Sequence, residues 1–239
     1  VTAENLVDKY SISRDDQDAF SFRSHMKATA ARDAGRLAQE IVQVNIPRRK
    51  QDDLIFEHDE FIKPDTTVEI LSKLRPAFRK EGGSVTAGNS SGLNDGSAAL
   101  LLANESGLSS SGLSPLAQII SSAVVGVEPR IMGIGPVRAS EIALKRAGIT
   151  FDDLDVIELN EAFSAQALAC IRAWGLDDDD SRINPNGGGI SIGHPLGVTG
   201  SRILLAAARQ LERTGGKYGL VTLCIGVGQG YAVVIKNTQ

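Results

Sequence analysis

The alternation of apolar and polar positions divides the chain into two unequal parts. Charged residues are dense over positions 1–81 and sparser afterwards. In the first part, Ser13 followed by acidic residues predicts the start of a helix that should end near Gly35. A short strand at 41–46 and a short helical stretch at 71–78 complete the elements expected there. This part is typical of an irregular, solvated subdomain.

Beyond residue 82 the apolar pattern becomes regular. It predicts helices at residues 94–103, 136–148, 162–174 and 200–214. It predicts strands at 116–127, 154–159, 219–224 and 230–235, of which the first is a β-branched apolar run typical of a buried strand. The order of these elements, roughly β-α-β-α-α-β-β, predicts a layered α/β unit with a mixed sheet.

Composition and charge narrow the class of protein. The 239 residues carry a net charge of -4, which gives no electrostatic reason to expect a nucleic acid or an anionic membrane as partner. No apolar stretch predicts a membrane span, and the start lacks the features of a signal peptide. Because the chain begins without Met and enters helical sequence almost at once, we expect a fragment or a trimmed product.

The chain has only two cysteines, Cys170 and Cys224. This usage favours a reducing compartment, so we expect the cytoplasm, or an organelle matrix in a eukaryote. No metal-ligand spacing such as CxxC or HExxH is present, so we expect no metal. Cys170 lies in an apolar helical run and should be a core residue.

Three short segments carry candidate chemistry at the ends of predicted elements. Asn160 follows a predicted strand, His194 lies in a Gly-rich loop, and Cys224 precedes a Gly-rich turn that contains Gly226. Each has a plainer interpretation: a helix N-cap, a buried structural histidine and a core cysteine. Together, however, a thiol, an imidazole, an amide and a free glycine N–H can remove a proton beside a carbonyl and hold the resulting enolate.

The other two histidines lie in charged segments, and we expect His25 and His58 to be solvated. A fourth segment, residues 87–96, is rich in Gly, Ser and Asn and could bring a ligand close to the backbone. A flexible linker between subdomains is the alternative interpretation of this segment.

These motifs, in their order and spacing, resemble those of the thiolases, the acetyl-CoA C-acyltransferases. Asn160-Glu161-Ala162-Phe163, Gly193-His194-Pro195 and Cys224-Ile225-Gly226 are similar to the family's NEAF, GHP and CxG motifs. Residues 88–95 resemble its pantetheine-contacting segment. The resemblance extends over essentially the whole chain.

The resemblance implies a fold and a set of roles. The fold would be a thiolase-like layered α/β fold with a mixed sheet, represented by the later part of the CoA-binding loop domain (1–91) and the second half of the duplicated core (92–239). His194 would activate a nucleophilic cysteine and help line an oxyanion hole. Cys224 would be the acid/base at the α carbon, the Gly226 N–H would serve the other oxyanion hole, and Asn160 would hold a catalytic water.

The resemblance also implies a ligand and partners. Coenzyme A would be a substrate, with no separate cofactor, and homodimers or tetramers would be expected. The positions matching those that contact CoA are Ala87, Ser90, Ser91, Phe163 and, on a looser match, Lys63.

One departure from the family pattern is large. The family's nucleophilic cysteine lies before the point that matches Val1, so we expect that half to be missing from this chain. The expected function is thiolytic cleavage of a 3-oxoacyl-CoA, or the reverse Claisen condensation, once that half is supplied. The motifs look most like degradative members, including those acting on 3-oxoadipyl-CoA. The alternatives are a non-catalytic CoA-binding or assembly fragment and, less well matched, a Cys–His hydrolase using Cys224.

Overall fold

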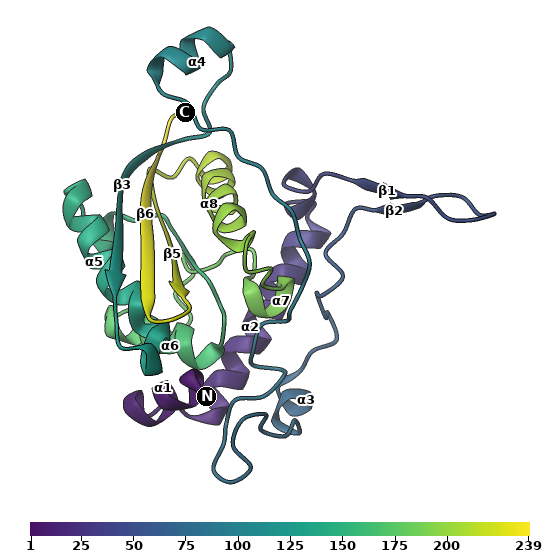
Figure 1. Cartoon of the computed structure of the whole chain (residues 1–239), viewed down its shortest axis with the longest axis vertical. Coiled ribbons are helices and arrows are strands. Elements are labelled where there is room, and N and C mark those ends of the chain that lie inside the picture. The colour runs from purple at the N-terminus through teal and green to yellow at the C-terminus, as the bar shows by residue number, and fades with distance from the viewer.

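A four-stranded mixed sheet forms the centre of the molecule (Figure 1), in a computed structural model that describes residues 1–239. Its strands are β3 (Ala117–Gly126), β4 (Val156–Leu159), β5 (Tyr218–Ile225) and β6 (Gln229–Asn237), in the order β3-β6-β5-β4. β4 and β5 are parallel, whereas β6 runs antiparallel to both of its neighbours. This confirms the predicted layered α/β fold with a mixed sheet.

Helices cover both faces of the sheet. α5 (Gly135–Ala147) and α6 (Ser164–Ala173) pack on one face, and α8 (Thr199–Thr214) packs on the other. Side chains of β4 alternate between the two cores, with Ile157 facing α6 and Val156 facing α8. Because β4 and β5 are parallel, their carboxyl ends meet at one edge of the sheet.

The first part of the chain packs around this core. It comprises α1 (Thr2–Tyr10), α2 (Arg14–Asp33), the hairpin β1 (Val44–Ile46) and β2 (Leu54–Phe56), and α3 (Val68–Ser72). The hairpin projects away from the body of the molecule (Figure 1). The remaining short elements are α4 (Glu105–Ser111), α7 (Gly189–Ile192), and the 3-10 turns η1 (Leu37–Gln39), η2 (Pro129–Ile134) and η3 (Phe151–Asp153).

The predicted start of α2 is confirmed. Ser13 has extended backbone, and its hydroxyl accepts a hydrogen bond of 3.0 Å from the Asp16 N–H. This satisfies one of the N–H groups that the first turn of a helix leaves without a partner. The helix ends at Asp33, just before Gly35 with its φ of 72°.

Replacing Ser13 by alanine should lower the free energy of unfolding by about 1 kcal/mol, because the Asp16 N–H loses its acceptor. Urea denaturation followed by circular dichroism measures the change. Ser109→Ala is the control, since the Ser109 hydroxyl is exposed and bonds only a carbonyl within α4. Equal stabilities of the two variants would contradict the capping role.

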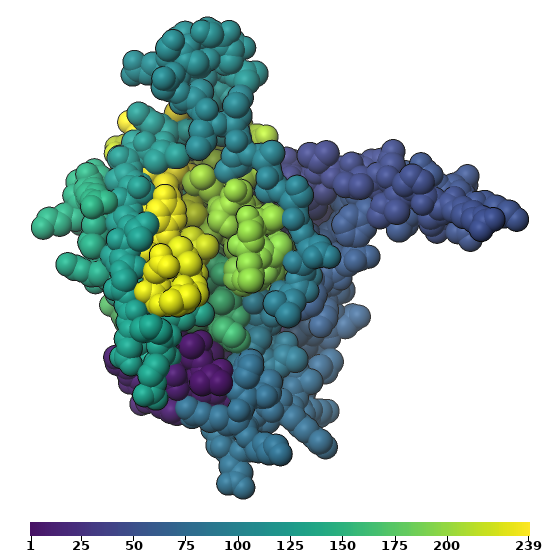
Figure 2. All heavy atoms as spheres, viewed as in Figure 1, coloured from purple at the N-terminus to yellow at the C-terminus, as the bar shows by residue number.

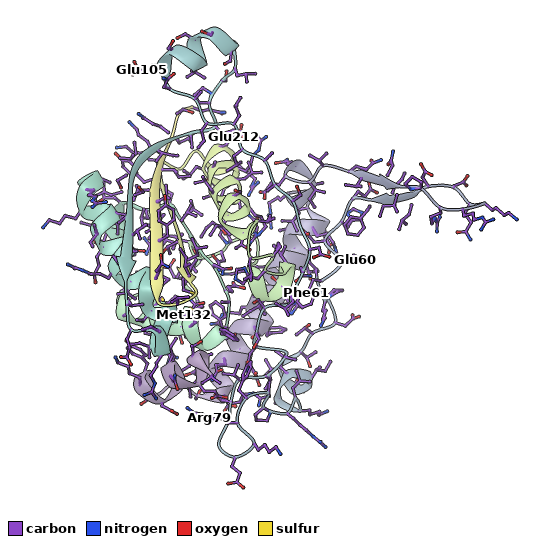
Figure 3. The ribbon with its side chains drawn as sticks, viewed as in Figure 1. Glu60, Phe61, Arg79, Glu105, Met132 and Glu212 are labelled. Carbon is purple, nitrogen blue, oxygen red and sulfur yellow. The ribbon has the colours of Figure 1, made fainter.

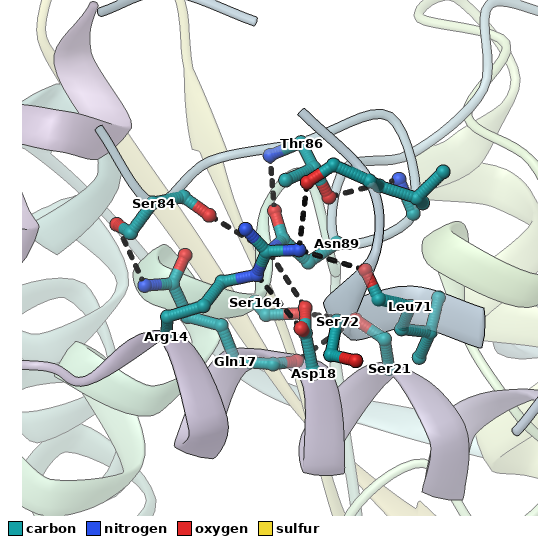
Figure 4. A network of polar contacts seen from close by, with 12 residues as sticks. Arg14, Gln17, Asp18, Ser21, Leu71, Ser72, Ser84, Thr86, Asn89 and Ser164 are labelled. Carbon is teal, nitrogen blue, oxygen red and sulfur yellow. Dashed lines mark hydrogen bonds and ion pairs between the residues drawn. The ribbon is translucent and has the colours of Figure 1, made fainter. Parts of the chain in front are cut away.

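A buried polar network fastens residues 84–89 to α2 (Figure 4). Asp18, which is 1% exposed, accepts hydrogen bonds from Arg14 Nε (2.7 Å) and Asn89 Nδ2 (3.0 Å). The Asn89 side chain also accepts from the Thr86 N–H at 2.7 Å. Its main-chain carbonyl accepts from the Ser164 N–H at the start of α6. The network therefore fixes the segment 84–91 against the helix that follows β4.

The predicted helix at 94–103 is wrong. Residues 92–104 form neither helix nor strand, and the predicted apolar face is exposed, with Leu101 78% and Leu102 71% accessible. The start of the segment is pinned by close packing: a Cβ on Gly96 would lie 2.9 Å from the Pro195 ring. The stretch left beyond this contact is too short to form a helix without a surface to cover its apolar side chains.

Two predictions of burial are also wrong. The strand predicted at 116–127 exists as β3, but it is an edge strand, and Val124 is 62% exposed. His25 is only 4% exposed, and its Nδ1 accepts a hydrogen bond of 3.3 Å from the Lys63 N–H. Burial, with a smaller contribution from the nearby Lys63 charge, lowers the pKa of His25 to about 4. His58 is exposed, as predicted.

None of the helices combines the length and the apolar character that crossing a membrane requires.

Candidate active site

Asn160 and His194 meet at the edge of the sheet where β4 ends. Asn160 is the first residue beyond β4, and its Nδ2 lies 3.2 Å from His194 Nε2. The plain N-cap interpretation of Asn160 is wrong, because α6 is capped by Phe163 and makes no side-chain capping bond. Asn160 Oδ1 is buried without a partner in this chain, as an atom that binds an ordered water would be.

The hydrogen bonds of His194 select one tautomer. Its Nδ1 lies 2.8 Å from Thr199 Oγ1, and that hydroxyl donates to the Pro195 carbonyl at 3.1 Å. The Thr199 oxygen therefore accepts from Nδ1–H, which leaves Nε2 as an acceptor facing Asn160. Burial, and secondly the charge of Arg202, hold the pKa of His194 below its usual value of 6.5. The imidazole is thus neutral near pH 7, with the lone pair of Nε2 turned toward the Asn160 amide.

Cys224 lies near the carboxyl end of β5, the parallel neighbour of β4. The Asn160 N–H donates to the carbonyl of Thr222, two residues before Cys224. The Cys224 side chain is 7% exposed, and burial raises the pKa of its thiol to about 11. No hydrogen bond links its sulfur to His194, so their direct contact stays a prediction.

The turn after Cys224 leaves the Gly226 region open. A Cβ on Gly226 would meet no atom within 4 Å, and the neighbouring Val227 has a φ of 69° and is 87% exposed. The turn is held at one point, where the Val127 N–H donates to the Gly228 carbonyl at 2.8 Å. The side of Gly226 that a Cβ would occupy is therefore open at the end of the sheet.

Three of the predicted CoA-contacting residues lie side by side. Ser90 forms an isolated antiparallel bridge with Phe163, and both the N–H and the hydroxyl of Ser91 donate to the Ala162 carbonyl at 3.1 Å. The Phe163 ring packs edge-on against Phe78, with ring centroids 6.3 Å apart. Ala87 is exposed on the same segment.

Lys63 lies on a neighbouring segment that contacts the loop of His194 indirectly. Its Nζ lies 4.9 Å from the centre of the Phe61 ring, labelled in Figure 3. That ring packs against Gly92, whose carbonyl accepts from the His194 N–H at 3.2 Å. The residues predicted to bind CoA are therefore joined to the Asn160–His194 pair through Gly92 and Ala162.

Three residues that build this site are not predicted as site residues from the sequence. Thr199 sets the His194 tautomer, and Glu161 and Asn184 are buried and hydrogen-bonded to each other. The signal for Glu161 was its place in the NEAF motif beside Asn160. No group of three His, Cys, Asp or Glu side chains in the structure is arranged to hold a metal ion.

The site and fold together define the class of protein. Family models described as the thiolase N-terminal domain and the thiolase C-terminal domain match residues 1–106 and 113–237. The chain belongs to the thiolase family. The two models meet between residues 106 and 113, and the domain boundary between 91 and 92 stays a prediction.

Within this family, the chain is similar to several curated proteins and solved structures. The chain is 53% identical to a β-ketoadipyl-CoA thiolase of Pseudomonas aeruginosa over 99% of its length and 58% of that protein. It is 51% identical to an acetyl-CoA acetyltransferase of Chromobacterium violaceum, covering 99% of the chain and 60% of that protein. The solved structure of a Bacillus anthracis acetyl-CoA acetyltransferase matches with a TM-score of 0.94 and 45% identity, over 99% of this chain and 59% of that one. The chain thus spans about three-fifths of the length of the curated relatives it matches.

Proposed function

We propose that this chain supplies the acid–base part of an acyl-CoA C-acyltransferase that cleaves a 3-oxoacyl-CoA with coenzyme A. The observation that carries the proposal is the Asn160–His194 pair at the end of β4, next to the parallel strand β5 that carries Cys224 near its own carboxyl end. In such a reaction a thiolate takes the acyl group, and the bond between the α and β carbons breaks. The electron pair stays on the α carbon as the enolate of acetyl-CoA.

Each residue has a role in this step. The Cys224 thiol, whose pKa of about 11 keeps it protonated near pH 7, gives its proton to the α carbon of the enolate. The Gly226 N–H and a water on Asn160 stabilise developing oxyanions. His194 Nε2, which is unprotonated and faces the Asn160 amide, accepts the proton of the nucleophilic thiol.

We further propose that the nucleophile comes from outside this chain. Cys170 is fully buried in α6, and burial raises the pKa of its thiol far above neutrality. Cys224 is also protonated at neutral pH and suits the acid role. Neither offers the exposed, low-pKa thiolate that accepting an acyl group requires.

The substrate we propose is a 3-oxoadipyl-CoA, with coenzyme A as the second substrate. Relatives described as acting on this class, from Pseudomonas, Acinetobacter and Escherichia coli, are 50–53% identical to the chain. Coenzyme A would approach along Ala87, Ser90, Ser91 and Phe163, with Lys63 near its phosphates. We also propose that the complete protein is a homo-oligomer of the cytoplasm.

A chimera tests the proposal directly. This chain is joined to the portion of the P. aeruginosa relative that lies outside the match, and thiolysis of 3-oxoadipyl-CoA and acetoacetyl-CoA is assayed for the chimera and for the chain alone. We expect turnover by the chimera, with the larger kcat/KM for 3-oxoadipyl-CoA, and none by the chain alone. Normal turnover by the chain alone would show that Cys170 or Cys224 is the nucleophile.

Two other outcomes decide between the candidate functions. A folded chimera that binds CoA in calorimetry without cleaving either substrate would favour the non-catalytic CoA-binding fragment. Preference for acetoacetyl-CoA would replace the proposed substrate while leaving the reaction unchanged.

An apolar surface that this chain leaves uncovered supports the proposal that a further part of the protein packs against it. Figure 2 shows α8 and β6 at the surface, where Leu204 and Tyr231 are only partly buried.

A further inference from the structure

Glu161 is a buried carboxylate next to the site that the proposed reaction does not use. It is 1% exposed, and no ion pair joins it to a basic side chain. It accepts three hydrogen bonds from uncharged donors: Ser24 Oγ at 2.6 Å, Asn184 Nδ2 at 2.7 Å and the Ile190 N–H at 3.2 Å. Ser24 lies in α2, Asn184 in the loop between α6 and α7, and Ile190 in α7.

Asn184 cannot turn its amide to suit a different side chain at position 161. Its Oδ1 accepts from the Leu159 N–H at 2.8 Å, and its Nδ2 donates to the Leu159 carbonyl at 2.8 Å. A flip would break both bonds to β4. The amide NH2 therefore always faces Glu161, and the pocket requires a group that only accepts hydrogen bonds.

Glu161 and Asn160 hold two ends of one loop. Glu161 binds the N–H of Ile190 in α7, and Asn160 contacts the ring of His194 four residues later. The loop also packs tightly on the carboxylate, since a Cβ on Gly188 would lie 2.6 Å from Glu161 Oε2. Movement of the carboxylate would move α7, and with it the start of the turn that carries His194.

We propose that Glu161 is a positioning residue for His194, which anchors α7 while the neighbouring Asn160 holds the imidazole ring. The catalytic consequence rests on the function proposed above, but the placement of the ring does not. Glu161→Gln is the sharpest variant, because it keeps the shape and puts an amide NH2 against one of three donors. The ring should then leave its contact with Asn160 and become more exposed.

The test is a pH titration of the histidine ring signals by NMR in the full 239-residue chain. In the unchanged chain, His194 should titrate below 6.5 because it is buried. In Glu161→Gln the pKa of His194 should rise toward 6.5. A folded Glu161→Gln chain with an unaltered His194 titration would overturn the proposal, because lost stability alone does not move that signal.

Two further variants cover the case in which Glu161→Gln does not fold. Ser24→Ala removes one hydrogen-bond donor and leaves the Glu161 carboxylate in place. It should therefore raise the pKa of His194 as well, but by less than Glu161→Gln does. Glu161→Asp keeps the acceptor and should restore part of the wild-type titration. Absence of any His194 shift in a folded Ser24→Ala chain would equally refute the proposal.

Kinetics of the chimera separate this inference from the proposed function. Glu161→Gln should lower kcat by about tenfold with KM changed less than about twofold, because the group it positions acts in chemistry rather than in binding CoA. If the unaltered chimera is inactive, the proposed function fails, while the NMR result still decides whether Glu161 positions His194. If the chimera is active and Glu161→Gln changes only KM, the positioning role is wrong.

Discussion

Replacing His194 by alanine should reduce kcat for thiolysis by the chimera by roughly 10²–10⁴-fold, the range expected for loss of a positioned general base. The structure gives the reason. Hydrogen bonding to Thr199 and a lowered pKa keep the imidazole neutral, with Nε2 unprotonated and able to accept a proton. Alanine removes that acceptor and leaves the thiol of the nucleophile protonated. Stopped-flow or steady-state assays of 3-oxoadipyl-CoA cleavage measure the loss.

His58→Ala provides the matched control, because His58 is exposed on the segment after β2. It should leave kcat unchanged within about twofold, the scatter expected of a surface substitution. Asn160→Ala should give a smaller loss than His194→Ala, since it removes a partner of the base rather than the base itself. A His194→Ala chimera that keeps near-normal kcat would remove His194 from the mechanism.

Replacing Glu158 by glutamine should stabilise the chain at neutral and alkaline pH. Glu158 lies on β4, is 1% exposed, and neither of its carboxyl oxygens has a hydrogen-bond partner. Burial raises its pKa to about 8, an effect that the positive charge of Arg202 offsets only in part. The folded chain must therefore hold this carboxyl protonated, or carry an unpaired buried charge.

The stability should depend on pH because protonation of Glu158 is coupled to folding. Since the pKa is raised from 4.5 to about 8 on folding, the folded state binds the proton more tightly. Stability from this group is complete below pH 4.5 and is lost as pH rises toward 8. Glutamine does not ionise, so the variant does not lose this stability as the pH rises. Its free energy of unfolding should therefore exceed that of the wild type by roughly a few kcal/mol near pH 8.

Urea denaturation at a series of pH values between 5 and 9 measures this difference. The control is Glu141→Gln, because Glu141 is an exposed carboxyl paired only with Arg138 on α5. That variant should change stability by less than about 1 kcal/mol at every pH, as expected for a surface ion pair. Parallel stability curves for Glu158→Gln and the wild type would mean that folding does not raise the pKa of the Glu158 carboxyl.

Local sequence signals were sufficient to predict a helix end or a strand wherever a short stretch of residues determines its own backbone conformation. Ser13 predicts the start of α2, and Gly148, with a φ of 72°, ends α5 as expected. The apolar runs at 219–224 and 230–235 predict β5 and β6, because the middle of each strand is buried. The order and spacing of the motifs also indicated the family, since these depend on sequence alone.

The tertiary structure decided which side chains meet and which are buried. The apolar pattern of 94–103 predicts a helix, yet the start of the stretch packs closely against residues 193–195, and Leu101 and Leu102 remain exposed. His25 lies among charged residues in sequence but is buried by packing against the segment of Lys63. The three donors of Glu161 come from residues 23 to 137 positions away. Periodicity describes one element at a time, whereas burial and hydrogen-bond partners depend on what folds against it, and only the assembled chain supplies that information.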